Sequence, residues 1–396
     1  MEVIPGYKQS DVGIIPEDWV VVSLSEIGDS LIGLTYQPSK VRKYGTLVLR
    51  SSNIQNGLLC FDNNVFVETK IPERIKVRPG DILICTRNGS RKLIGKSAII
   101  DERATGMTFG AFMGVFRSDQ GQYLRHMFKS DIFKKQINEH LGATINQITS
   151  KSLKSFKVPL PQKNQERIKI ADVLNNVDEL AVGLDQLIAK KRNLKQATMQ
   201  QLLNGKIRLI GFKKKWLELQ LKEITKPQKG QLITKNTIVD GDIPVIAGGQ
   251  QPSCYHAQAN RNGKTITISA SGAYAGYIAF HKTPIFASDC STISESNTYS
   301  IEFLYYSLLL KQKQIYAAQT GGAQPHIQPK ELGPILIKIP EDLNEQNAIA
   351  TVLSDIDLEI SKLEIRRNKI QNIKKAMMQE LLTGKTRLMK SEKMDA

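Results

Sequence analysis

Two long stretches of the chain place apolar residues at the spacing of one helical face. In residues 158–209 the apolar side chains follow a three-four spacing, and in residues 338–396 they recur at heptad spacing. The predicted coiled-coil positions are Ile170, Val173, Val177, Leu180, Leu184, Leu187, Ile349, Ile356, Leu363 and Ile370. Each stretch therefore predicts a long helix that packs against another helix.

The two helical stretches are copies of one sequence. The segment that begins at Pro161 aligns without a gap to the segment that begins at Pro340, ~179 residues later. Roughly 20 of about 49 positions are identical, and both copies close with Leu-Leu-x-Gly-Lys-x-Arg-Leu. Two copies in one chain favour an antiparallel coiled coil with pseudo-twofold symmetry. Two helices buried separately in two domains are the alternative.

The stretches before each helix, residues 1–157 and 210–337, show short β-prone runs between turn residues, followed by helical patterns. This pattern predicts α+β domains, each with a twisted, mainly antiparallel sheet plus helices. The two domains open alike, each around one of the two tryptophans. The predicted order is a first domain (1–157), a helix (158–209), a second domain (210–337), and a helix with a tail (338–396).

The charge of the chain favours a polyanionic partner. Lys and Arg number 55 against 38 Asp and Glu, which gives a net charge of +17. Nucleic acid fits best, and a merely solubilising surplus is the alternative. No apolar run approaches the roughly 20 residues that span a membrane, and residues 1–13 lack the apolar core of a signal peptide. We therefore expect a cytoplasmic protein without a membrane partner.

Signs of metal binding and catalysis are weak. Cys254, His256, His281 and Cys290 match no common zinc spacing, so we expect no bound metal. The chain lacks a phosphate-binding loop, a dinucleotide fingerprint, and the Asn- or Asp-Pro-Pro-aromatic motif of amino-methyltransferases. We expect no cofactor bound by this chain and no enzymatic activity of its own. A cryptic magnesium nuclease built on Asp62, Glu68 and Lys70 is the alternative.

Polar loops in both domains carry side chains suited to DNA. Arginine pairs with guanine, Asn and Gln pair with adenine, and Ser and Lys contact phosphates. The candidate DNA-binding residues are Arg50, Ser52, Asn53, Gln55, Arg87, Asn88, Ser90, Arg91 and Lys92 in the first domain, and Gln250, Gln251, Ser269, Ser271, Tyr274, Thr320, Gln324 and His326 in the second. A solvated turn is the alternative for each loop. Because the domain interiors differ in sequence, we expect two different ligands.

The order of these motifs resembles one family over essentially the whole chain. Pro-Glu-Asp-Trp at 16–19, Val-Pro-Leu-Pro at 158–161 and Leu-Leu-Asn-Gly-Lys-Ile-Arg-Leu at 202–209, each with a near-copy in the second half, are similar to the specificity subunit of type I restriction-modification systems. The resemblance implies two target recognition domains, each reading one half of a bipartite asymmetric DNA site. It implies a coiled coil that sets the gap between the halves.

The resemblance also implies partners. Two methyltransferase subunits would dock on the helices and flip the target adenine, and restriction/translocase subunits would cut the DNA. S-adenosylmethionine, ATP and magnesium would be used by these partners and not by this chain. No family motif fixes the base-reading residues. A coiled-coil scaffold with nonspecific DNA affinity is the alternative function.

Overall fold

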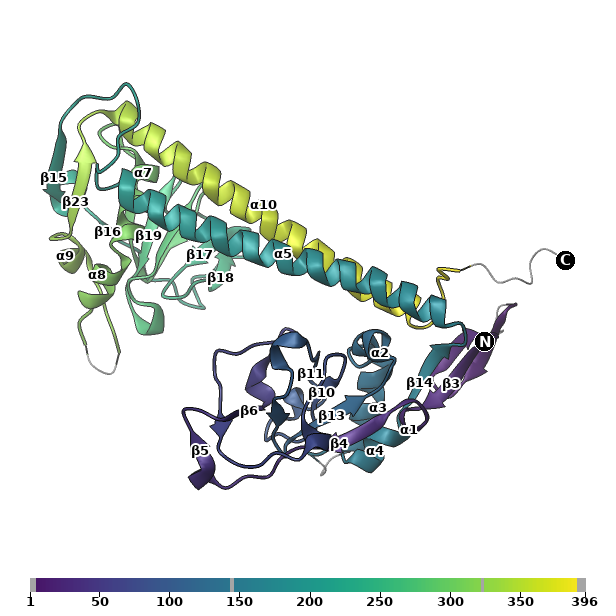
Figure 1. Ribbon diagram of the computed structural model, residues 1–396. Helices are drawn as coiled ribbons and strands as arrows, with labels where there is room; N and C mark the ends of the chain where they lie inside the picture. The colour runs from purple at the N-terminus through teal and green to yellow at the C-terminus, as the bar shows by residue number, and fades with distance from the viewer. Residues whose placement is uncertain (1–4, 143–145, 322–323, 390–396) are drawn as a thin grey trace. The chain divides into compact units, whose positions relative to one another are not determined.

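The computed structural model describes residues 5–142, 146–321 and 324–389 (Figure 1). It forms two compact units, and each combines segments that are distant in the sequence. Unit 1 contains residues 1–183 and 367–396, and unit 2 contains residues 184–366. No helix in the described part of the chain is long and apolar enough to cross a membrane.

Two helices of 39 residues each, α5 (Asn164–Leu202) and α10 (Leu343–Leu381), contribute to both units. In unit 2, Lys191 pairs with Glu359 at 2.5 Å and Lys195 pairs with Asp357 at 2.6 Å. The later residue on α5, Lys195, thus pairs with the earlier residue on α10, Asp357. The two helices therefore run antiparallel. Within each unit their segments lie side by side (Figure 1). The predicted antiparallel coiled coil is confirmed.

The predicted coiled-coil positions of α5 form two rows spaced by heptads, 170/177/184 and 173/180/187. The structure largely buries the first row as predicted but shifts the second row by one residue. Ile170 and Leu184 are buried, as predicted, and Val177 is half-buried. The second row consists of Leu174 and Ile188, which are both buried. The residues predicted for that row lie differently, since Leu180 and Leu187 are exposed and Val173 is only half-buried. Because α5 carries apolar residues in both rows, the spacing alone allowed either register.

The seam of α10 follows the predicted heptads. Ile349 is buried, while Ile356, Leu363 and Ile370 are half-buried. Leu353 and Ile360 form the second row and are buried.

A pair of antiparallel strands stands directly before each long helix. In unit 1, β3 (Trp19–Ser23) pairs with β14 (Lys157–Pro161), and in unit 2, β15 (Trp216–Gln220) pairs with β23 (Leu336–Pro340). The register places Trp19 opposite Pro161 and Trp216 opposite Pro340. We call the segment 19–161 the first module and the segment 216–340 the second module. The two ends of each module are thus neighbouring strands, and the second of these strands leads into a long helix.

The first module contains two small four-stranded sheets and a group of short helices. One sheet has the order β11-β10-β13-β4 and is antiparallel, and the other has the order β12-β6-β9-β5 with one parallel pair, β12 with β6. The bounds are β4 (Asp29–Ile32), β5 (Val41–Arg42), β6 (Thr46–Leu49), β7 (Ile54–Gln55), β8 (Leu58–Leu59), β9 (Phe66–Val67), β10 (Ile82–Cys85), β11 (Ser97–Ile99), β12 (Thr108–Phe109) and β13 (Met113–Arg117). The hairpin β1 (Tyr7–Ser10) and β2 (Gly13–Pro16) precedes the module.

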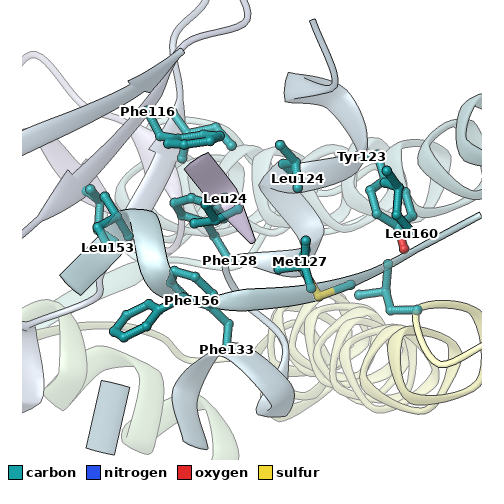
Figure 2. Close-up of a cluster of buried hydrophobic side chains, with 14 of the residues drawn as sticks. Leu24, Phe116, Tyr123, Leu124, Met127, Phe128, Phe133, Leu153, Phe156 and Leu160 are labelled. Carbon is teal, nitrogen blue, oxygen red and sulfur yellow. The ribbon is translucent and has the colours of Figure 1, made fainter. Parts of the chain in front are cut away.

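The helices of the first module, α1 (Leu24–Ile27), α2 (Gly121–Met127), α3 (Asp131–Leu141) and α4 (Ser150–Ser155), cover an aromatic core (Figure 2). Phe128 stacks on Phe133 with ring centroids 4.3 Å apart, and Phe156 meets Phe133 edge-on at 5.6 Å. The Ser130 hydroxyl accepts the Phe133 N–H and caps α3, as a serine at a helix start commonly does. This core fixes the helices against the sheet.

The second module repeats the plan with a different interior. Its main sheet has the order β16-β22-β19-β20, and the central strand β19 is buried along its whole length. The bounds are α6 (Leu221–Ile224), β16 (Gln228–Lys229), β17 (Ile243–Ile246), β18 (Cys254–His256), β19 (Thr265–Ser269), β20 (Ile278–His281), β21 (Phe286–Ala287), β22 (Cys290–Ser294), α7 (Ile301–Leu310), α8 (Gln312–Ala317) and α9 (Pro329–Leu332). The predicted α+β modules alternating with two long helices are confirmed.

A buried glutamate in the first turn of each long helix is bound by the arginine of the repeated closing motif. In unit 1, Arg387 donates to Glu166 at 2.7 Å and 2.9 Å, and it also binds Asp18. The Trp19 indole N–H donates to the same glutamate at 3.4 Å. We call these four residues the first clasp. Glu166 is 1% exposed, so its charge is removed from water and depends on these partners.

Unit 2 contains the corresponding group. Arg208 donates to Glu345 at 2.6 Å and 2.9 Å, and the Trp216 indole N–H donates to Glu345 at 3.3 Å. Glu345 is 0% exposed. We call these three residues the second clasp. The clasps explain why the arginine of Leu-Leu-x-Gly-Lys-x-Arg-Leu and the opening tryptophan recur together in the sequence.

Candidate nucleic-acid interface

A hollow of about 560 Å³ on the first module gathers two of the predicted polar loops. Arg50 and Ser52 follow strand β6, while Arg87 and Asn88 follow strand β10, and all four line this hollow. The loops are joined directly, because the Asn88 side-chain amide donates to the Ser51 hydroxyl at 3.5 Å. We call this site the first hollow. It presents hydrogen-bonding side chains of the kinds that read base edges.

Aromatic side chains of the first hollow were missed by the sequence analysis. Phe112 is 61% exposed, and the guanidinium carbon of Arg87 lies 5.3 Å from the centre of its ring. Tyr36 lines the same hollow. Polar residue types alone do not identify them, whereas an exposed phenylalanine between short strands is itself a signal, since aromatic rings stack on bases.

Two polar atoms in the wall of the first hollow lack partners. The Arg50 Nε and the Ser52 hydroxyl are buried without a hydrogen bond to any described residue. Arg50 is otherwise held by Asn63, whose side-chain oxygen accepts from its Nη2 at 3.2 Å. Buried polar atoms without partners are uncommon in folded proteins, so these two mark the wall of the first hollow as a candidate binding surface.

Asn53, a predicted DNA-binding residue, lies in the interior of the module and not on its surface. Asn53 is fully buried, accepts the Arg50 backbone N–H at 2.9 Å and donates to the Cys60 carbonyl at 2.9 Å. It shapes the loop and is not exposed to a ligand. Gln55 is exposed on β7, and Ser90 is exposed in the next loop, where its N–H donates to Asn88. Arg91 and Lys92 line a separate pocket of the first module.

The second module carries its own hollow, of about 240 Å³, lined by Gln250, Gln251 and Ser269. Ser269 is buried, and its hydroxyl donates to the Gly248 carbonyl at 2.9 Å, so it holds the loop in place. His281 lies in the same wall, where burial lowers the pKa of its imidazole. We call this site the second hollow. Its lining contains no lysine or arginine among the described residues.

The remaining candidates of the second module surround a neighbouring loop. Ser271 hydrogen-bonds to the Asp289 carboxylate, and Tyr274 is exposed. The backbones of Thr320 and His326 pair with each other at 2.8 Å, and Gln324 is exposed between them. Residues 322 and 323 of this predicted loop lie outside the described residues.

The residues of the metal and nuclease alternatives have other partners in the described part of the chain. In the described ranges, no group of three or more His, Cys, Asp or Glu side chains is placed to hold a metal ion. The His256 ring accepts the Val239 N–H, and burial raises the pKa of the Cys290 thiol to about 12. Glu68 pairs with Arg42 at 3.4 Å, while Asp62 accepts from Cys60.

Comparison with known proteins identifies the class. The family model described as the type I restriction modification DNA specificity domain matches residues 16–195 and 213–375, so this chain belongs to that family. A putative type I restriction enzyme MjaX specificity subunit of Methanocaldococcus jannaschii is 26% identical over 96% of this chain and 97% of its own length. The type I restriction enzyme EcoKI specificity subunit of Escherichia coli is 30% identical over 49% of this chain, and the match spans 44% of that relative's length.

Solved structures share the fold. The type I restriction-modification S subunit from M. genitalium superposes with a TM-score of 0.65 at 16% identity, covering 96% of this chain and 98% of that one. A chain from a type I system solved in a study of complex assembly and conformational transition gives a TM-score of 0.56 at 17% identity, covering 94% and 99%. The likeness extends over both modules and both helices.

Proposed function

We propose that this chain is the DNA sequence-specificity subunit of a type I restriction-modification complex and that it has no catalytic activity of its own. Each module would read one half of a bipartite asymmetric site. The observation that carries this proposal is a repeated frame of clasps and strand pairs that holds two hollows of different lining. A symmetric enzyme would keep the same chemistry in both copies, whereas a reader of two half-sites needs two different surfaces.

In the first hollow, Arg87 and Asn88 are the proposed base readers. Arginine suits the two acceptors of guanine, and asparagine suits the donor and acceptor of adenine. Phe112 would pack beside them against a base or thymine methyl group. In the second hollow, Gln250 and Gln251 would play the corresponding part, since a glutamine amide also matches adenine.

The helices of unit 2 offer a surface for protein partners. Leu187 and Leu194 on α5 and Leu358 and Ile365 on α10 lie outside the seam and are 40% to 65% exposed. Each pair is one heptad apart, which is the spacing that a further helix can cover. We propose that methyltransferase subunits, two per complex, dock on such helical surfaces. These and the restriction/translocase subunits would supply S-adenosylmethionine, ATP and magnesium chemistry.

The test is to map methylated adenines after co-expressing the chain with the methyltransferase encoded beside it. We expect a split asymmetric motif that the methyltransferase alone does not produce. The double variant Arg87→Gln with Asn88→Ala should change or abolish only one half of the motif, because it alters only the first hollow. Arg103→Gln is the matched control, since Arg103 is exposed, pairs with Asp101 and does not line the hollow.

Two results would count against the proposal. An assembled complex that produces no new motif would favour the scaffold alternative. A double variant that leaves both halves unchanged would show that the first hollow does not read bases.

A further inference from the structure

Beside the first hollow lies a strongly basic pocket of about 470 Å³. No aspartate or glutamate among the described residues lines it. Five cations do so, namely Arg91, Lys92, Lys96, Lys129 and Lys134. We call this site the basic pocket. Arg91 and Lys92 belong to the short 3-10 helix that follows the Arg87 loop, and Lys96 directly precedes β11. Lys134 lies on helix α3, and Lys129 directly precedes the residue that caps this helix. So many cations gathered around one cavity create a field that attracts an anion.

Backbone carbonyls, not carboxylates, hold three of these cations in place. The Arg91 guanidinium donates to the Gly142 carbonyl at 2.6 Å, and the Lys129 ammonium donates to the Gly57 carbonyl at 3.1 Å. The Lys96 ammonium donates to the Ser51 carbonyl at 3.3 Å. A carbonyl orients a cation but does not neutralise it. Of the five cations, Lys134 pairs with Asp131 at 3.3 Å, so the pocket keeps the charge of the three that carbonyls hold in place for a ligand.

Lys129 is held in a position that is unfavourable for its charge. The pKa of its ammonium is lowered to about 8, mainly by burial, and the neighbouring Lys374 and Arg125 lower it by more than Asp178 raises it. Lys129 is half-buried, and a cation that is partly removed from water beside other cations destabilises the folded chain. A bound anion would remove this penalty.

We propose that the basic pocket binds the sugar–phosphate backbone of the DNA half-site whose bases occupy the first hollow. The two sites are contiguous, because Ser51 lines the hollow and its carbonyl holds Lys96 of the pocket. Arg91 and Lys92 likewise follow Asn88 in the same loop. The inference rests on the proposed function and divides the surface between a reading part and a positioning part. The lining of the second hollow, by contrast, contains no lysine or arginine among the described residues.

This division predicts a particular failure. Phosphate contacts act on all DNA sequences alike, and each lost contact reduces the slope of log affinity against log salt by about 0.9. Removing cations from the pocket should therefore weaken binding to every duplex by a similar factor. It should leave the methylated motif unchanged.

The test uses the complex of the full chain with its methyltransferase subunits and two duplexes, one with the mapped motif and one without it. Dissociation constants are measured over a sodium chloride series. The double variant Lys92→Gln with Lys134→Gln should bind both duplexes roughly tenfold more weakly at low salt, with a slope smaller by about one to two. Lys135→Gln is the matched control, because Lys135 lies on the same helix, is exposed, and does not line the pocket.

A second variant separates loss of binding from loss of folding. Lys129→Met should weaken DNA binding in the same way, yet its melting temperature should stay the same or rise because a half-buried cation with a lowered pKa is removed. A wild-type salt slope in the variants would overturn the inference. So would weaker binding limited to the motif duplex, or loss of the methyltransferase subunits on purification, which would make the pocket a protein-docking site.

The same experiment can disprove the proposed function independently of the basic pocket. If the wild-type complex does not distinguish the two duplexes, the reading role is wrong whatever the lysine variants do. If it distinguishes them and the variants keep the wild-type slope, only the basic pocket is wrong.

Discussion

The two clasps bury the same glutamate but balance its charge differently. In the first clasp, Arg387 is shared between Glu166 and the half-exposed Asp18. In the second clasp, Arg208 binds Glu345, and the position that corresponds to Asp18 in the repeat is Lys215. The glutamate, the arginine and the indole N–H are common to both, whereas the outer carboxylate is not. The buried group is therefore the essential part, and the outer acid is a local addition.

This difference predicts unequal dependence on the glutamates. When the buried charge of the second clasp is removed, its arginine has no carboxylate left in the clasp. In the first clasp, Arg387 still has Asp18. Because Trp19 and Trp216 are the only tryptophans and each belongs to one clasp, the fluorescence of either tryptophan, with the other replaced by phenylalanine, reports unfolding around one clasp.

The largest effect is expected for Glu345→Gln. Breaking a buried ion pair by removing one partner leaves the other uncompensated, and we expect the free energy of unfolding of unit 2 to fall by about 3 kcal/mol. The measurement is denaturant unfolding followed by Trp216 fluorescence. A change below about 1 kcal/mol would show that the second clasp is not held by this charge.

Glu166→Gln should destabilise unit 1 less, by about 1 to 2 kcal/mol, because Asp18 continues to neutralise Arg387. Unfolding is followed through Trp19. If this variant loses as much stability as Glu345→Gln, Asp18 does not compensate and the comparison between the clasps is wrong.

The smallest effect is expected for Asp18→Asn. Asp18 is 44% exposed, so solvent screens its ion pair, and the loss at neutral pH should stay below about 0.5 kcal/mol. The hydrogen bonds from Arg387 hold the pKa of Asp18 below its usual value. A lowered folded-state pKa stabilises the fold above the unfolded pKa, and this contribution disappears as the pH falls through the folded value.

The difference in stability between wild type and Asp18→Asn should therefore be present at pH 7, and it should disappear as the pH falls below about 4, the usual pKa of an aspartate, and through the lower folded-state value. Matched unfolding curves from neutral to acid pH, followed through Trp19, measure it. A difference that persists in acid would mean that the asparagine disturbs packing and not charge.

The features that repeat along the chain could be predicted from the sequence. The two helices, their antiparallel pairing and the alternation with α+β modules follow from heptad spacing and from the internal copy. The register of α5 could not be fixed in this way, because Val173 and Leu174 are both apolar and only packing places Leu174 in the seam. Sequence spacing reports which faces are apolar but not which of two apolar rows meets a partner.

The candidate interface was predicted less completely. Arg50 and Arg87 were found because polar residues cluster in their loops, and the structure places them in one hollow. Asn53 is the same residue type in the same loop, but its side chain is used by the backbone. Lys96, Lys129 and Lys134 gave no signal, since they lie far apart in the sequence and meet only in the folded module.

The strand pairs at the base of the modules have an evolutionary consequence. Paired strands lie about 5 Å apart, so each module is a long insertion whose two ends are neighbours, with Trp216 opposite Pro340 in the second. A recombination event that exchanged everything between such strands for another sequence, even one of different length, would leave the clasp and the helix in place. The paired strands would then hold a different insert, and under the proposed function a new half-site could be read in one step without a new fold.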